Sequence, residues 1–178
     1  VIDNLGPADS PGAFSALAIA ENDIPHVFDE QTIAETHGLK VPPAKERSDM
    51  CALPFVTIDG ADARDFDDAV LATPLEGGGW EIRVAIADVS HYVRPGSALD
   101  AEARKRGNSV YLPDRVVPML PEALSNDLCS LRPNEPRAAI VAIITMEEDG
   151  DVTSHSFERA LIHSAARLTY DKVQAWYE

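Results

Sequence analysis

The stretch AAIVAIITMEEDGDVTSHSFERALI, residues 138–162, contains two long runs that favour β structure. The runs cover 138–146 and 152–162, and Glu148-Asp149-Gly150 lies between them. Runs rich in β-branched and apolar residues indicate strands, and an Asp-Gly pair between two such runs is typical of a tight hairpin turn. The stretch therefore predicts a long antiparallel hairpin, and with it a sheet-based fold.

Shorter strand-like runs lie upstream of this hairpin, at 54–58, 69–72 and 80–89, and Gly77-Gly78-Gly79 predicts a second hairpin turn. A helix is predicted over 97–106, with Ser97 as its N-cap and Gly107 after its end, and another begins at Thr169. Three strands, a helix, two strands and a final helix are typical of an α+β domain. We therefore expect a mostly antiparallel or mixed sheet flanked by helices.

The first fifty residues differ in character from the rest of the chain. Two short helices are predicted, at 10–22 and 29–36, followed by a polar segment at 42–49 that contains two prolines. This pattern is typical of a connector between domains rather than of a core. We therefore predict a connector over 1–50 and a separate domain over 51–178.

Composition and charge limit the classes of function that the chain can have. Apolar residues make up 45% of the 178 residues and charged residues 25%, which is the balance of a globular protein. The sequence lacks the roughly 20 consecutive apolar residues that a membrane span requires. Cys51 and Cys129 are the only cysteines, so a disulfide scaffold or zinc ribbon is excluded and a cytoplasmic location is expected. The net charge of −15 repels nucleic acid unless a cation or a basic partner intervenes.

The segment TIDGADARDFDDA, residues 57–69, places five aspartates within ten residues between two apolar runs. Like charges held this close repel each other by about 1 kcal/mol per pair in bulk water, and by more when they are partly desolvated. Such a cluster is tolerable when a cation occupies it, and oxygen ligands without nearby His or Cys select Mg²⁺ or Mn²⁺ over zinc. The segment therefore predicts a metal site for phosphodiester chemistry.

An aspartate-rich segment is more commonly a solvated turn or a calcium loop, and each of these fits the residues less well. Against a solvated turn stand the apolar runs on both sides and Phe66, an aromatic between aspartates. A calcium loop that starts at Asp65 would place Val70 where a glycine must turn the chain. Elsewhere, Asp88 and His91 suggest an acid/base pair, although a structural histidine explains that spacing equally well.

The aspartate segment resembles a motif of the catalytic (RNB) domain of the ribonuclease II/ribonuclease R family. Further blocks resemble the family in the same order, and the residues of the motif fit the ribonuclease R branch better than the ribonuclease II branch. The resemblance covers about 53–178, and residues 1–50 resemble the segment that follows the family's cold-shock OB domains. These further blocks are VAIADVSHYV (84–93), GNSVYLPDRVVPMLP (107–121), LSNDLCSL (124–131) and ARLTY (166–170).

The resemblance implies a Mg²⁺-dependent 3′-to-5′ exoribonuclease that hydrolyses RNA from a single-stranded 3′ end and releases nucleoside 5′-monophosphates. It also implies that basic OB and S1 domains of a longer chain take part in RNA binding, and that neither a membrane nor DNA is a partner. Asp59, Asp65 and Asp68 match the family's metal-binding aspartates, and Asp67 matches the aspartate needed for cleavage. Tyr111 matches the aromatic that packs against the terminal nucleotides; taken alone, it would be an ordinary aromatic of a sheet.

The family's active site also uses an arginine and a glutamate from later in the catalytic domain. We therefore expect the chain as given to bind metal weakly, bind RNA poorly and be inactive or nearly so. Two other functions remain open. One is a different metal-dependent phosphohydrolase that acts on a small phosphate ester, and the other is a non-catalytic RNB-like module that binds RNA or a protein.

Overall fold

The structure is a computed structural model that describes residues 5–7 and 9–178, and it divides into two compact units. One unit comprises Val1–Gly38 and Val93–Ser125, and the other comprises Leu39–Tyr92 and Asn126–Glu178. We call them the helical unit and the barrel unit. The assignment of residues 1–50 to an inter-domain connector stays a prediction.

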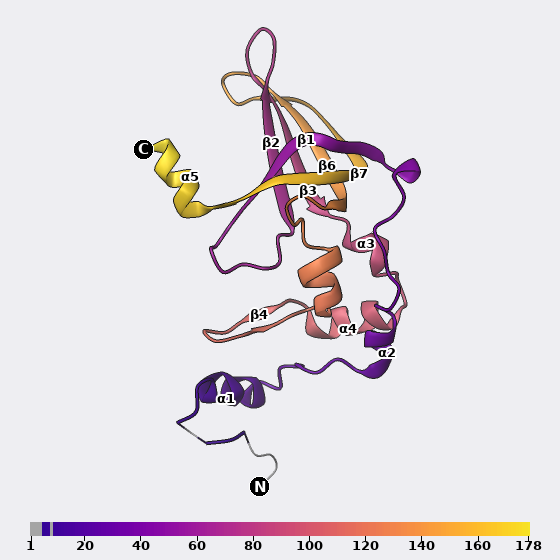
Figure 1. The fold of residues 1–178 in the computed structure, drawn as a ribbon, viewed down its shortest axis with the longest axis vertical. Helices are drawn as coiled ribbons and strands as arrows, with labels where there is room; N and C mark the ends of the chain where they lie inside the picture. The colour runs from indigo at the N-terminus through magenta and orange to yellow at the C-terminus, as the bar shows by residue number, and fades with distance from the viewer. Residues whose placement is uncertain (1–4, 8) are drawn as a thin grey trace. The chain divides into compact units, whose positions relative to one another are not determined.

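The barrel unit is built on a closed five-stranded barrel in the order β1-β2-β3-β6-β7 (Figure 1). Short helical elements precede, interrupt and follow these strands. The strands are β1 (Ser48–Asp59), β2 (Asp68–Pro74), β3 (Trp80–Ala87), β6 (Pro136–Met146) and β7 (Val152–Thr169). The helical elements are η1 (Ala44–Glu46), α3 (Val89–Tyr92) and α5 (Tyr170–Tyr177), and η2 (Leu124–Leu128) lies where the chain enters the barrel unit for the second time.

The pairing of these strands confirms the predicted mixed sheet within an α+β fold. Neighbouring strands from β1 through β2, β3 and β6 to β7 pair antiparallel, and β1 closes the barrel by pairing parallel to β7. The closure was not predicted, because it joins residues as distant in sequence as Ser48 and Ala160. No hairpin turn signals a contact of that kind.

The strands of the barrel bury several small side chains together with larger apolar ones. Fully buried alanines come from β2, β3, β6 and β7, and the bulkier Phe55 of β1 fills space beside them. Two of these alanines are adjacent in β6 and therefore face opposite sides of the sheet, so both faces of this strand are covered at that point. The fully buried alanines are Ala69, Ala85, Ala138, Ala139 and Ala160.

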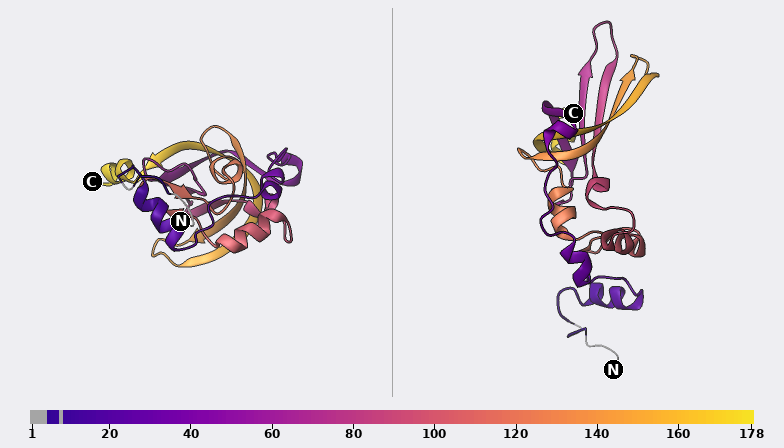
Figure 2. Two further views of the ribbon diagram at one scale, coloured as in Figure 1. Left: turned by 90° about the horizontal axis from the view of Figure 1, so that it is seen from below. Right: turned by 90° about the vertical axis from the view of Figure 1, so that its right-hand side faces the viewer.

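Two hairpins and one loop mark the opposite ends of the barrel (Figure 2). The predicted turn at 77–79 joins β2 to β3, and the predicted turn at 148–150 joins β6 to β7. The segment 60–67, which joins β1 to β2, lies at the other end, because Asp68 pairs with Ile86 at the far end of β3 from its hairpin. The aspartates therefore lie at the end of the barrel away from the hairpins.

The helical unit contains α1 (Ala13–Glu21), α2 (Glu30–Ala34), α4 (Ala98–Arg106) and the two-stranded ribbon of β4 (Val110–Tyr111) and β5 (Val116–Val117). As predicted, Ser97 caps α4 and Gly107 follows its end. The helix predicted from residue 10 begins instead at Ala13, with Gly12 as its N-cap. Among residues 5–7 and 9–178, no helix is both long and apolar enough to span a membrane.

Candidate metal centre

Asp59 is the last residue of β1 and pairs with Thr169 at the end of β7. Its Oδ2 atom is buried and has no hydrogen-bond partner. Burying a carboxylate oxygen without a donor is costly, and a bound cation removes that cost. Asp59 is therefore suited to hold a metal ion from the wall of the barrel.

The other three predicted aspartates of the site follow along one short loop. Asp65 and Asp67 flank Phe66, whose side chain is only 5% exposed, and Asp68 is the first residue of β2. The carbonyl oxygen of Asp67 accepts a hydrogen bond of 2.9 Å from the amide of Ala87. Phe66 is thus buried, and the loop is anchored in the barrel rather than loose in solvent.

The electrostatics show that the four carboxylates act on one another. Burial raises the pKa of Asp59, and the charges of Asp68, Asp67 and Asp65 raise it further, whereas Arg167 acts in the opposite sense. Asp67 lies at the surface, yet partial desolvation by the surrounding protein raises the pKa of its carboxyl, and Asp68 and Asp65 add to this. The structure therefore places Asp65, Asp67 and Asp68 near enough to Asp59 to disfavour its ionisation.

The donor set of this cluster fits a hard divalent cation. It consists of carboxylate oxygens that repel each other, one of them buried without a donor, and such oxygens are the ligands that Mg²⁺ and Mn²⁺ prefer. In the part of the chain that the structure describes, no three His, Cys, Asp or Glu side chains form a ready ligand group. The roles of Asp59, Asp65 and Asp68 as metal ligands stay a prediction.

Two residues that hold the aspartate loop were not singled out from the sequence. Ser130 Oγ contacts the backbone of Arg64 and Phe66, and Arg167 Nη2 donates to the carbonyl oxygens of Gly60 and Ala61. Both lie in blocks that resemble the family, at 124–131 and 166–170, which is the one signal that pointed to them. Their contacts depend on strands distant in the sequence.

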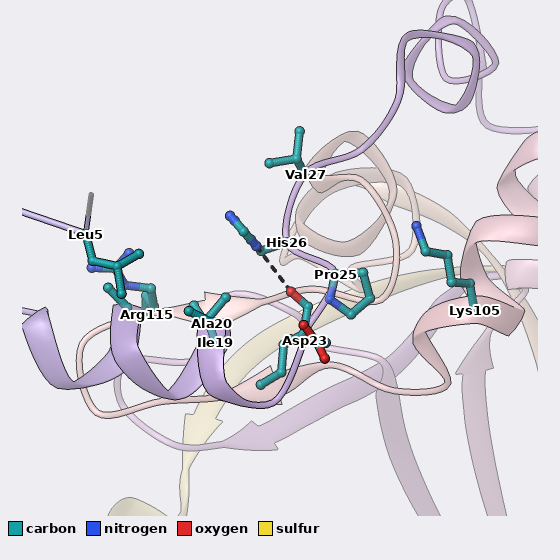
Figure 3. Close-up of a pocket in the computed structure, with 11 residues that line it drawn as sticks. Leu5, Ile19, Ala20, Asp23, Pro25, His26, Val27, Lys105 and Arg115 are labelled. Carbon is teal, nitrogen blue, oxygen red and sulfur yellow. Dashed lines mark hydrogen bonds between the residues drawn. The ribbon is translucent and has the colours of Figure 1, made fainter. Parts of the chain in front are cut away.

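Tyr111, predicted to pack against RNA, belongs to the helical unit, where it lies in β4 with 66% of its surface exposed. Its role stays a prediction. The same unit contains a cavity of about 570 Å³ between α1, the turn at 23–27 and Lys105 (Figure 3). His26 Nδ1 lies 3.2 Å from the carbonyl oxygen of Ile24 there. None of the predicted site residues lines this cavity.

Comparison with known proteins agrees with the motif and the fold. Ribonuclease R of Vibrio cholerae is 51% identical over 177 residues, which are 97% of this chain and 22% of that protein. RNase R of Mycoplasma genitalium in complex with double-stranded RNA superposes with a TM-score of 0.91 at 35% identity, over 97% of this chain and 31% of that one. The same protein in complex with ribose-methylated single-stranded RNA gives a TM-score of 0.90 at 35% identity, over 97% and 28%.

The chain thus spans about a fifth of the length of the curated relatives that it matches. The family model of the RNB domain matches residues 47–178, which contain the barrel and all four aspartates. The resemblance inferred from the motifs is therefore confirmed, and the chain belongs to the RNB domain family.

Proposed function

We propose that this chain is the first part of the catalytic domain of a Mg²⁺-dependent exoribonuclease of the ribonuclease R type. In this proposal the whole protein hydrolyses RNA from a single-stranded 3′ end and releases nucleoside 5′-monophosphates. The observation that carries it is the buried, unpartnered Oδ2 of Asp59 beside three further carboxylates. The relatives named ribonuclease R and the RNA in the Mycoplasma genitalium structures support the choice of substrate.

Each residue of the site has a separate role in the proposal. Asp59, Asp65 and Asp68 hold one or two Mg²⁺ or Mn²⁺ ions, which activate water at neutral pH and offset charge on the phosphodiester. Asp67, an exposed residue of the loop, would position either the attacking water or the second metal ion. Tyr111 stacks on the terminal bases, which holds any base without selecting a sequence.

The acidic charge of the chain requires help from elsewhere in the whole protein. With 30 acidic against 15 basic residues, this chain repels RNA at long range. We propose that basic OB and S1 domains supply the attraction, and that neither DNA nor a membrane is a partner. A cytoplasmic location is in keeping with Cys51 and Cys129, which are both free thiols.

The test compares the whole protein with its Asp67→Asn variant on an RNA that carries a 3′ overhang. Nucleotide release should fall by on the order of 10²-fold or more, because a small misplacement of an attacking group has that effect. Asp62→Asn is the matched control, since Asp62 is an exposed aspartate of the same loop outside the predicted set. The Asp62→Asn variant should release nucleotides at the rate of the parent. Removal of divalent ions with a chelator should abolish nucleotide release by the parent and by Asp62→Asn.

The same assay separates the two other functions. Release of phosphate from a phosphomonoester with intact RNA left over would identify a phosphohydrolase of small esters. Retention of RNA without any nucleotide release would identify a non-catalytic binding module. An Asp67→Asn protein that degrades RNA at the parent's rate would contradict the role given to Asp67.

A further inference from the structure

The loop that carries the aspartates is fastened to the barrel unit by two side chains, Ser130 and Arg167. We infer that Ser130 and Arg167 are positioning residues that set the directions of the carboxylates around the metal ion. The inference rests on the proposed function, because it concerns the same site. It assigns a task to two residues that touch the backbone of the loop rather than the reacting groups.

Ser130 joins two points of the loop with a single atom. The residue has no exposed surface, and its Oγ donates to the carbonyl oxygen of Arg64 at 2.9 Å and accepts from the amide of Phe66 at 3.2 Å. The neighbouring amide of Leu131 donates to the carbonyl oxygen of Phe66 at 2.6 Å. Only a hydroxyl is both small enough for this place and able to donate and accept at once.

The backbone of Ser130 is itself held rigidly by Arg137, a side chain with 5% exposure. Its Nε donates to the carbonyl oxygens of Ser130 and Asp127, both at 3.0 Å. Its Nη2 donates to the Asp127 carboxylate at 2.9 Å and to the Glu135 carboxylate at 2.6 Å. A buried guanidinium with this many partners permits little movement, so Ser130 is a fixed point for the loop.

Arg167 holds the first part of the loop and supplies positive charge. Its Nη2 donates to the carbonyl oxygens of Gly60 and Ala61, and its guanidinium lies 4.8 Å from the centre of the Phe66 ring. This distance is within the range of a cation–π contact. The charge of Arg167 also acts favourably on ionised Asp59, so one side chain orients the loop and offsets part of its repulsion.

The contacts of both residues meet at Phe66. Its amide is bonded to Ser130, its carbonyl oxygen to Leu131, and its ring lies against Arg167. Asp65 and Asp67 are the two neighbours of Phe66 in the chain. Fixing the position of Phe66 therefore also restricts the backbone positions from which the two aspartate side chains extend. Outer residues that orient ligands in this way typically contribute about 10- to 100-fold to metal affinity.

The test measures Mn²⁺ binding to the whole protein by electron paramagnetic resonance, together with kcat and KM on RNA. Ser130→Ala should weaken Mn²⁺ binding by about tenfold and lower kcat, with little change in KM, because ligands lose their direction while RNA contacts remain. Ser164→Ala is the matched control, as Ser164 is a serine of the same barrel with 2% exposure that bonds Ala166 rather than the loop. It should bind Mn²⁺ like the parent.

A second variant covers the case in which Ser130→Ala fails to fold. Arg167 is only half-buried, and Arg167→Lys keeps its charge while losing the planar guanidinium that places Nη2 against both carbonyl groups and stacks on Phe66. It should also weaken Mn²⁺ binding. Parent-like Mn²⁺ affinity in either folded variant would overturn the role of that residue, and loss of the fold in both would show that the two residues are merely structural.

The result also separates this inference from the proposed function. If the parent binds no Mn²⁺, or if it releases no nucleotides from RNA, the proposed function itself fails. If the parent passes both tests and neither Ser130→Ala nor Arg167→Lys alters Mn²⁺ binding, the inference alone fails.

Discussion

Asp88 and Arg47 form an ion pair of 2.6 Å with side chains that are 0% and 3% exposed. Ser90 Oγ donates to the same carboxylate at 2.6 Å, and Arg47 also reaches the carbonyl oxygen of Ala139. The amide of His91 donates to the carbonyl oxygen of Asp88 at 3.0 Å, and the acid/base pair suggested for these two residues stays a prediction. The ion pair links the start of β1 to the end of β3.

This pair predicts how stability depends on pH. Burial alone would raise the pKa of Asp88, but hydrogen bonds from Ser90 and Arg47 and the charges of Arg47 and Arg159 outweigh it, and the pKa is lowered. A carboxyl with a lowered pKa in the folded state stabilises the protein above its unfolded pKa of about 3.9. That stabilisation is lost as the pH falls through the lowered pKa, so the urea midpoint should drop as the pH falls from neutrality into that range.

Asp88→Asn should destabilise the protein by about 3–5 kcal/mol at pH 7, because it leaves Arg47 buried without a counter-charge. Its urea midpoint should also depend less on pH than that of the parent. Asp62→Asn, which alters an exposed aspartate, serves as the control and should unfold like the parent. Equal midpoints for all three proteins at pH 7 would show that the ion pair contributes nothing to stability.

Single residues were predictable from the sequence when their signal was local. The aspartates of the site stand within ten residues of each other, so their composition alone pointed to a metal. Cys129 is buried, and desolvation raises the pKa of its thiol to about 12. Ser130 and Arg167 gave no comparable signal, because their hydrogen bonds to the loop form only when the fold brings segments that are distant in the sequence next to it.

At the scale of elements, caps and turns were the reliable features. Ser97 caps α4 as predicted, and Thr169, where a helix was predicted to begin, caps α5; each side chain accepts a hydrogen bond from a backbone amide of the first turn. The ribbon of β4 and β5 was not predicted, since strands of two residues exist only through their pairing. The strand predicted over 80–89 ends at Ala87, and α3 begins at Val89.

The hairpin between β2 and β3 gives a test at this scale. Gly79 has a φ of +80°, and a Cβ on it would lie 2.2 Å from the carbonyl oxygen of Met146 in β6. Gly77 has a φ of +99° but open space around it. Alanine at either position should lower the free energy of unfolding by about 1–2 kcal/mol, because the backbone there has a positive φ. Gly79→Ala should lower it by about 1–3 kcal/mol more, because the added Cβ displaces the edge of β6.

Urea unfolding of the two alanine variants measures this difference directly. Gly77→Ala is the matched control, since it carries the same backbone strain without the contact. Equal losses of stability in both variants would mean that the turn relaxes away from β6, and that the close approach of Gly79 to Met146 does not constrain the hairpin.

For the whole molecule, the sequence predicted a mixed sheet and not its closure. The antiparallel neighbours follow from hairpins, whereas the parallel pairing of β1 with β7 brings together segments about as far apart as the barrel unit allows. The buried stretches of β6 and β7, at 137–139 and 160–162, each contain three consecutive residues, so both faces of these strands are covered there, which fits a closed barrel as well as an open sheet packed on helices. Hydrophobic periodicity identifies the buried face of a strand, but it does not identify which strand pairs with the edge of the sheet and closes the barrel.

The charge of the whole chain predicts how it behaves apart from the longer protein proposed above. With a net charge of −15, the 178 residues alone should bind RNA weakly, and added salt should not weaken that binding because screening reduces the repulsion. RNA binding by the longer protein should fall steeply with salt if basic domains supply the attraction. Filter binding of one labelled RNA across a salt series measures both, and steep salt dependence in the 178-residue chain would contradict the prediction.

Nucleotide release by the 178-residue chain should also be slower than release by the longer protein, by on the order of 10²-fold or more. Removing one group that stabilises developing charge has an effect of that size. The family resemblance places an arginine and a glutamate of the active site beyond the blocks that this chain contains. Both proteins would be assayed on the same RNA with saturating Mg²⁺, and circular dichroism would establish that the 178-residue chain is folded. Equal turnover would mean that the carboxylates at the end of the barrel are sufficient for the chemistry, and that the further groups serve another purpose.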